Sequence, residues 1–212
     1  MLSGIDVHDK QGKIDWHKVA GAGNSFAFVR GAYGDRTDDR AQENFDGARQ
    51  AGLRCGLYHF YRMNPAHPFT RQIDCMIAVL KHVGYGAGDL PPVLDVEDNP
   101  HYDGEWNSSN NTTYMQGLRD WVNRVSAEFH ATPIIYTRAG FWNALGKPNA
   151  FSDHPLWVAH YTQANSPTIP SGWMKYAFWQ FADAETVDGV PGTGDVNRFN
   201  GTAADLSALL QG

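Results

Sequence analysis

The chain has 212 residues, of which 42% are hydrophobic and 19% charged, and its formal net charge at pH 7 is −6. This length and composition suit a single folded domain with a sizeable core and exclude a disordered chain. The chain has no basic run that could neutralise phosphates and no long apolar run, so neither nucleic acid nor a membrane is an expected partner.

The chain opens with MLSGIDVHDK, which lacks a basic stretch followed by an apolar one, so no signal peptide is expected within it. A secreted protein would have lost its leader before this numbering begins, and otherwise the chain is made in a cytoplasm. The two cysteines, Cys55 and Cys75, are too few for a disulfide scaffold or a cysteine-ligated zinc site. Free thiols are favoured, but a bridge between them stays open.

Short apolar strands alternate with amphipathic helices through the first two thirds of the chain. Apolar runs bounded by Gly or Pro predict strands at residues 3–7, 26–34, 53–61, 91–97 and 133–137. Hydrophobic residues at helical spacing, ended by glycine in most cases, predict helices at residues 14–23, 38–52, 68–83 and 113–129. This alternation predicts a parallel sheet.

Three more strands are predicted at residues 155–161, 176–181 and 194–200, but the segments between them are short and have little helical periodicity. Eight strands indicate closure into a TIM-like α/β barrel whose last crossovers are degenerate. Neither an internal repeat nor a linker is visible. We therefore expect one domain over residues 1–212.

Reactive side chains gather where these strands end, which is the edge at which such barrels carry their active sites. Asp95 and Glu97 stand two residues apart in LPPVLDVED, so they share one face of the strand about 6.6 Å apart along the backbone. Neighbouring carboxyls in a low-dielectric pocket raise one another's pKa, which is how a general acid stays protonated near neutral pH. Asp98 is out of phase and should point away. The alternative is a rim of solvated acids.

Other polar and aromatic side chains fall at or near the same strand ends. Asp6 ends the first strand, and Asp195 stands at the start of the last one. Aromatic rings there can stack on the apolar faces of sugars, although each one alone is more often a core residue. The candidate substrate-binding residues are Tyr33, Tyr58, His59, Tyr61, Tyr136, Trp157, His160, Tyr161 and Gln180.

Eight motifs in this order resemble glycoside hydrolase family 25, the lysozymes that act as N-acetylmuramidases. They are GIDV with the following QG-IDW, then FVRGAYG, GLYHFY, LPPVLDVE, PIIYT, PLWVAHY, FWQF and DVNRFNG, and they span almost the whole chain. The resemblance implies an irregular (β/α)5β3 barrel. It also implies hydrolysis of the β-1,4 bond between N-acetylmuramic acid and N-acetylglucosamine in bacterial peptidoglycan.

The family's motifs assign roles to four carboxyl groups of this chain. Glu97 would donate a proton to the leaving oxygen, and Asp95 would orient the substrate's 2-acetamido group, whose oxygen attacks the anomeric carbon. Asp6 and Asp195 would hold the charge and hydrogen bonds of the pocket. The spacing of Asp95 and Glu97 leaves direct nucleophilic attack open, and assistance is preferred on the resemblance alone. No cofactor and no metal are implied.

Tyr33 departs from the family's pattern, because many members carry an acidic residue there. Two rival functions stay open. One is a non-catalytic sugar-binding barrel, and the other is a metal-dependent hydrolase using carboxylates and histidines at strand ends. Neither His-x-His nor HExxH occurs in the sequence, which weakens the metal hypothesis. We expect a monomer with one catalytic domain and without a separate module that binds cell walls. It would act on cell walls as a secreted enzyme or a phage lysin.

Overall fold

The structure is a computed structural model that describes residues 1–64, 66–104, 107–146 and 148–210. In this part of the chain nine strands form one sheet, and eight of them close into a barrel through the pairing of β1 with β2. The strands are β1 Leu2–Val7, β2 Asn24–Tyr33, β3 Arg36–Thr37, β4 Arg54–Phe60, β5 Val93–Asp95, β6 Ile134–Thr137, β7 Leu156–Ala159, β8 Phe178–Glu185 and β9 Gly194–Phe199. The predicted TIM-like barrel is confirmed.

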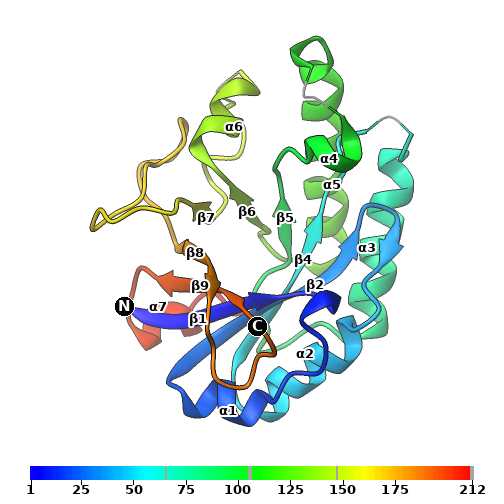
Figure 1. Cartoon of the computed structure of the whole chain (residues 1–212). Coiled ribbons are helices and arrows are strands. Elements are labelled where there is room, and N and C mark those ends of the chain that lie inside the picture. The colour runs from blue at the N-terminus through cyan, green and yellow to red at the C-terminus, as the bar shows by residue number, and fades with distance from the viewer. Residues whose placement is uncertain (65, 105–106, 147, 211–212) are drawn as a thin grey trace.

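The helices cover one side of this barrel more completely than the other. They are α1 Trp16–Gly21, α2 Ala41–Gln50, α3 Phe69–His82, α4 Pro100–Asp103, α5 Asn111–Phe129, α6 Ala139–Ala144 and α7 Ala203–Ser207, with short 3-10 turns at Asp9–Gln11 and Ser108–Asn110. Figure 1 shows the long helices beside β2, β4 and β5, whereas loops accompany β7 and β8. The degenerate last crossovers predicted from the sequence are therefore confirmed. No helix among the described residues is long and apolar enough to cross a membrane.

One prediction about the sheet was wrong, because the sheet is not all parallel. β9 runs antiparallel to both of its neighbours, β1 and β8, while the other neighbouring barrel strands pair in parallel. The connection from β8 to β9 is too short to carry the chain back to the starting edge, so β9 returns as a hairpin partner. β9 thus begins at the edge where the parallel strands end.

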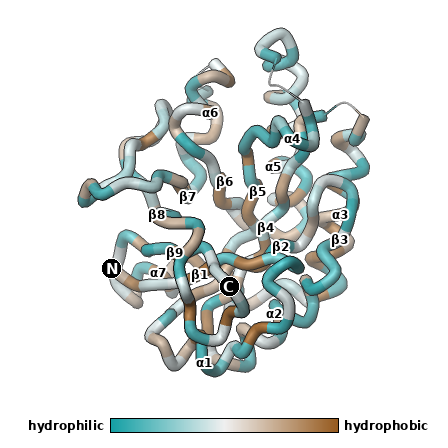
Figure 2. Tube along the Cα trace, in the orientation of Figure 1, coloured by the Kyte–Doolittle hydropathy of each residue, from teal (hydrophilic) through white to brown (hydrophobic). Residues whose placement is uncertain are grey.

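Two hydrophobic layers stabilise the barrel, one inside it and one between it and the helices. The inner layer is largely aromatic: Phe26, Phe28, Tyr58, Leu90, Val93, Ile134, Tyr136, Trp157, Phe178, Phe199 and Leu206. Glycines make room for it, because a Cβ on Gly4 would lie 2.6 Å from the ring of Phe26, and one on Gly56 would lie 2.9 Å from Phe28. Figure 2 shows hydrophobic residues on central strands such as β2 and β5, and a hydrophilic rim at β3 and α4.

Some elements differ from the sequence prediction in extent. The strand expected over residues 91–97 is regular only over β5, although Val96 still donates its backbone N–H to Tyr136 O at 2.9 Å. The short elements β3, α4, α6 and α7 were not predicted, since two to six residues are too few to show a period. Cys55 and Cys75 are both free thiols.

Candidate active site

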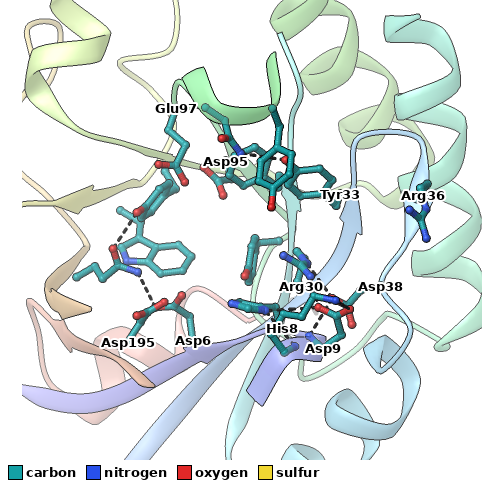
Figure 3. A pocket seen from close by; sticks show the side chains of 18 of the residues that line it. Asp6, His8, Asp9, Arg30, Tyr33, Arg36, Asp38, Asp95, Glu97 and Asp195 are labelled. Carbon is teal, nitrogen blue, oxygen red and sulfur yellow. Dashed lines mark hydrogen bonds and ion pairs between the residues drawn. The ribbon is translucent and has the colours of Figure 1, made fainter. Parts of the chain in front are cut away.

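A cavity of about 590 Å³ opens at the edge of the barrel where the parallel strands end (Figure 3). Inward-pointing residues of the strands form its floor, and the segments that follow the strands form its walls. It is lined by Asp6, His8, Asp9, Lys10, Arg30, Tyr33, Arg36, Thr37, Asp38, Asp39, Tyr58, Phe60, Asp95, Glu97, Asn99, Tyr102, Tyr136, Trp157, Tyr161, Gln180 and Asp195. The four carboxyl groups singled out from the sequence all line this one cavity.

Asp6 and Asp195 form a carboxyl pair across neighbouring strands. The antiparallel register places them directly opposite each other, and their side chains are in hydrogen-bonding contact. Asp6 Oδ2 also accepts hydrogen bonds from Gln180 Nε2 at 2.9 Å and Asn197 Nδ2 at 2.7 Å. Burial and the charge of Asp6 raise the pKa of Asp195 to about 9, so this pair retains a proton at neutral pH.

Asp95 ends β5 and is buried at the floor of the cavity. Burial, followed by the charges of Glu97 and Asp6, raises the pKa of Asp95 well above its ordinary value, while Arg30 opposes the shift. Among the described residues, Asp95 Oδ1 is buried without a hydrogen-bond partner. A buried carboxylate oxygen without a partner is costly, which agrees with the raised pKa of Asp95.

Glu97 lies two residues further along, at the wall of the same cavity, as Figure 3 shows. Burial and the nearby charge of Asp98 raise the pKa of Glu97 to about 7, against the opposing effect of Arg138. Asp98 does not line the cavity and accepts a hydrogen bond from Arg138 Nη2, so it points away as predicted. The Glu97 carboxyl can therefore hold a proton at a pH close to neutral.

Aromatic side chains surround these acids. Tyr58, Tyr136 and Trp157 lie on the floor, with ring centroids of Tyr136 and Trp157 4.7 Å apart. Gln180 Oε1 accepts hydrogen bonds from the hydroxyls of Tyr136 and Tyr161, both at 2.8 Å. At the other end, Tyr33 stacks on Phe60 with centroids 4.7 Å apart. Tyr161 is 51% exposed, which leaves part of its surface for a ligand.

Three residues predicted from the sequence to bind substrate do not line the cavity, so those predictions were wrong. His59 and Tyr61 follow the cavity residues Tyr58 and Phe60 in alternation, so they point outward toward the helices, where both are fully buried. His160 lies beyond β7, where its Nδ1 accepts the backbone N–H of Thr168 at 3.0 Å. The strand-end rule gave the correct edge of the barrel but ignored which face each side chain takes.

The sequence reasoning missed a buried ionic group at the same edge, formed by Asp9, Arg30 and Asp38. Arg30 Nε donates to Asp38 Oδ2 at 2.8 Å, and Arg30 Nη2 lies 2.5 Å from Asp9 Oδ1. The signal was present in the sequence, because Arg30 keeps the alternation of Phe26 and Phe28, whose side chains fill the barrel. Within the described residues no group of three or more His, Cys, Asp or Glu side chains could hold a metal ion.

An acidic pair at the mouth of a barrel with aromatic walls is the arrangement of a glycoside hydrolase that works with two carboxyl groups. Comparison with known proteins agrees with this class. The profile described as "Glycosyl hydrolases family 25" matches residues 5–190. Lysozyme M1 of Streptomyces globisporus is 39% identical over 215 residues, which cover 98% of this chain and 71% of that protein.

Two further relatives also match nearly the whole chain. A bacterial lysozyme structure from Streptomyces coelicolor superposes with a TM-score of 0.86 at 36% identity, covering 99% of this chain and 96% of its own. The N,O-diacetylmuramidase of Arthroderma benhamiae is 26% identical, covering 100% of this chain and 87% of its own. The chain therefore belongs to glycosyl hydrolase family 25 and is a glycoside hydrolase similar to lysozymes.

Proposed function

We propose that this enzyme hydrolyses the β-1,4 bond between N-acetylmuramic acid and N-acetylglucosamine, with Glu97 as the proton donor. The observation that carries the proposal is the position of Glu97 beside Asp95 in one cavity of about 590 Å³, where burial and Asp98 raise the pKa of Glu97 to about 7. The acid form can protonate the leaving oxygen, and the resulting carboxylate can then take a proton from water.

Asp95 assists the substrate in this proposal instead of attacking it. The Asp95 carboxyl lines the cavity beside Glu97 and would accept the N–H of the 2-acetamido group, whose carbonyl oxygen would then attack the anomeric carbon. The charge of Glu97 is one cause of the raised Asp95 pKa. When Glu97 takes up a proton, that charge disappears and Asp95 can lose its own proton more easily. A glycosyl-enzyme adduct on Asp95, detected by mass spectrometry, would contradict assistance.

Asp6, Asp195 and Gln180 support the reacting groups in this scheme. The Asp6–Asp195 pair holds the hydrogen bonds of the floor, and Gln180 links Asp6 to Tyr136 and Tyr161. The candidate sugar contacts that remain are Tyr33, Tyr58, Tyr136, Trp157, Tyr161 and Gln180. Because all of these groups belong to one barrel, a monomer would carry out this chemistry without a second copy, and it would reach the cell wall by secretion or phage lysis.

The decisive experiment digests purified peptidoglycan with the wild type and with Glu97→Gln, which keeps the shape but removes the transferable proton. We expect the wild type to release new reducing ends that appear as reduced muramic acid after borohydride treatment, and the variant to lose about 10²–10⁴-fold in kcat. Mass spectrometry identifies the sugar.

Four outcomes would refute the proposal or parts of it. Reduced glucosamine would overturn the bond assignment, and full activity of Glu97→Gln would remove the role of Glu97. Binding of peptidoglycan without release of reducing ends would support the sugar-binding alternative. Loss of wild-type activity in EDTA would support the metal-dependent alternative.

A further inference from the structure

The cavity continues past the acidic pair to the hairpin of β2 and β3. Arg36 on β3 pairs with Tyr33 on β2 in antiparallel register, so both side chains stand on the same face of the hairpin. Both also line the cavity. A glycan that lies against Tyr33 and continues along the cavity would therefore come toward this guanidinium group.

Among the described residues that line this end of the cavity, Arg36 is the one cation without a carboxylate partner. Arg30 pairs with Asp9 and Asp38, and Lys10 Nζ lies 3.2 Å from Asp9 Oδ2. Arg36 is exposed and has no ion pair within the described residues. Figure 3 shows it apart from the group of Arg30, Asp9 and Asp38.

The acidic surroundings of Arg36 indicate which kind of ligand it can bind. The cavity is rich in carboxyl groups, so an anionic substrate meets repulsion over most of its lining. A guanidinium group is well suited to bind a carboxylate through two parallel hydrogen bonds. The exposed Asp39 also lines the cavity, and its negative charge would weaken the attraction of Arg36 for an anion.

We propose that Arg36 binds the carboxylate of a muramic acid unit that lies against Tyr33, so that Arg36 selects acidic glycans. This rests on the proposed function, because muramic acid carries a lactyl group whose carboxyl is either free or joined to a peptide that itself ends in carboxylates. N-acetylglucosamine has no such group. Arg36 would therefore distinguish the two alternating sugars of the strand at this position.

The test compares three soluble glycan substrates: strands with their peptides, strands freed of peptides by an amidase, and strands whose carboxyls are converted to neutral amides. On the acidic substrates, Arg36→Gln should raise KM about three- to ten-fold and leave kcat within about two-fold of the wild type. On the neutral amides it should have no effect. Arg36→Lys should restore part of the affinity.

Two control variants sharpen the comparison. Arg119→Gln makes the same charge change at an exposed position on α5, away from the cavity, and should leave KM unchanged. Asp39→Asn removes the opposing charge and should lower KM for the acidic substrates. Added salt should reduce the difference between the wild type and Arg36→Gln.

The outcomes separate the sources of the carboxylate. An effect of Arg36→Gln that persists without peptides assigns the lactyl carboxylate, and one that disappears assigns the peptide. An unchanged KM on both acidic substrates, or an equal rise on the neutral amides, overturns the proposal. If the wild type releases no muramic acid reducing ends, the proposed function fails instead, whatever Arg36→Gln does.

Discussion

At the scale of single residues, Glu97 has the clearest functional property. Burial raises the pKa of its carboxyl most, the charges of Asp98 and Asp6 raise it further, and Arg138 lowers it. The net result is a pKa of about 7, high enough for an acid that must be protonated near neutral pH. The sequence predicted the pairing of Asp95 and Glu97, but burial of each carboxyl depends on the surrounding strands.

This pKa predicts the alkaline limb of the pH profile. A general acid acts in its protonated form, so kcat/KM on soluble glycan should fall above pH 7, about tenfold for each further pH unit. Asp98→Asn removes a charge that raises the pKa and should move the limb to lower pH. Arg138→Gln removes a charge that lowers it and should move the limb upward. If neither variant moves the alkaline limb, the limb does not arise from Glu97.

At the scale of secondary-structure elements, side chains of β4 alternate between lining the cavity and joining the strand to the helices. Tyr58 and Phe60 reach the cavity, whereas His59 faces the helices and links two elements. Its Nδ1 accepts from Trp121 Nε1 on α5, and its Nε2 donates to Gly34 O in the β2–β3 turn, both at 2.8 Å. Burial lowers the pKa of His59 to about 4, so it stays neutral and keeps both bonds at neutral pH.

Replacing His59 should therefore destabilise the protein. His59→Leu leaves the buried indole N–H of Trp121 and the carbonyl of Gly34 without their partner, at an expected cost of about 2–4 kcal/mol in the free energy of unfolding. Urea denaturation followed by tryptophan fluorescence measures this. His17→Gln, at an exposed position on α1, is the control and should change stability by less than about 0.5 kcal/mol. A loss as small as the control's would show that the two hydrogen bonds are dispensable.

At the scale of the whole molecule, closure of the barrel joins the two ends of the chain. β9 lies between β1 and β8, where it brings Asp195 to Asp6 and supplies Asn197 to the floor of the site. Figure 1 shows β1 and β9 side by side, although they are the first and last strands. The stability of the barrel and the completeness of the site depend on the same strand.

The full chain should unfold in one cooperative transition. A single barrel with continuous packing has no boundary at which part of it could remain folded, so calorimetric and van't Hoff enthalpies should agree in differential scanning calorimetry. A chain ending at residue 192 lacks β9, leaves two open sheet edges and should show no cooperative transition. Two resolved transitions in the full chain would indicate separate domains.

The sequence by itself determined the barrel, most of its strands and long helices, and the four carboxyl groups at its mouth. These follow from local periodicity, from the Gly and Pro residues that bound each element, and from motif order, all of which are written in short stretches of chain. Only the tertiary structure decided the antiparallel direction of β9, the outward positions of His59 and Tyr61, and the pairing of Arg30 with Asp9 and Asp38. Alternation along a strand records which side chains share a face, but which face points into the barrel and which residues meet there depend on contacts between residues far apart in the chain.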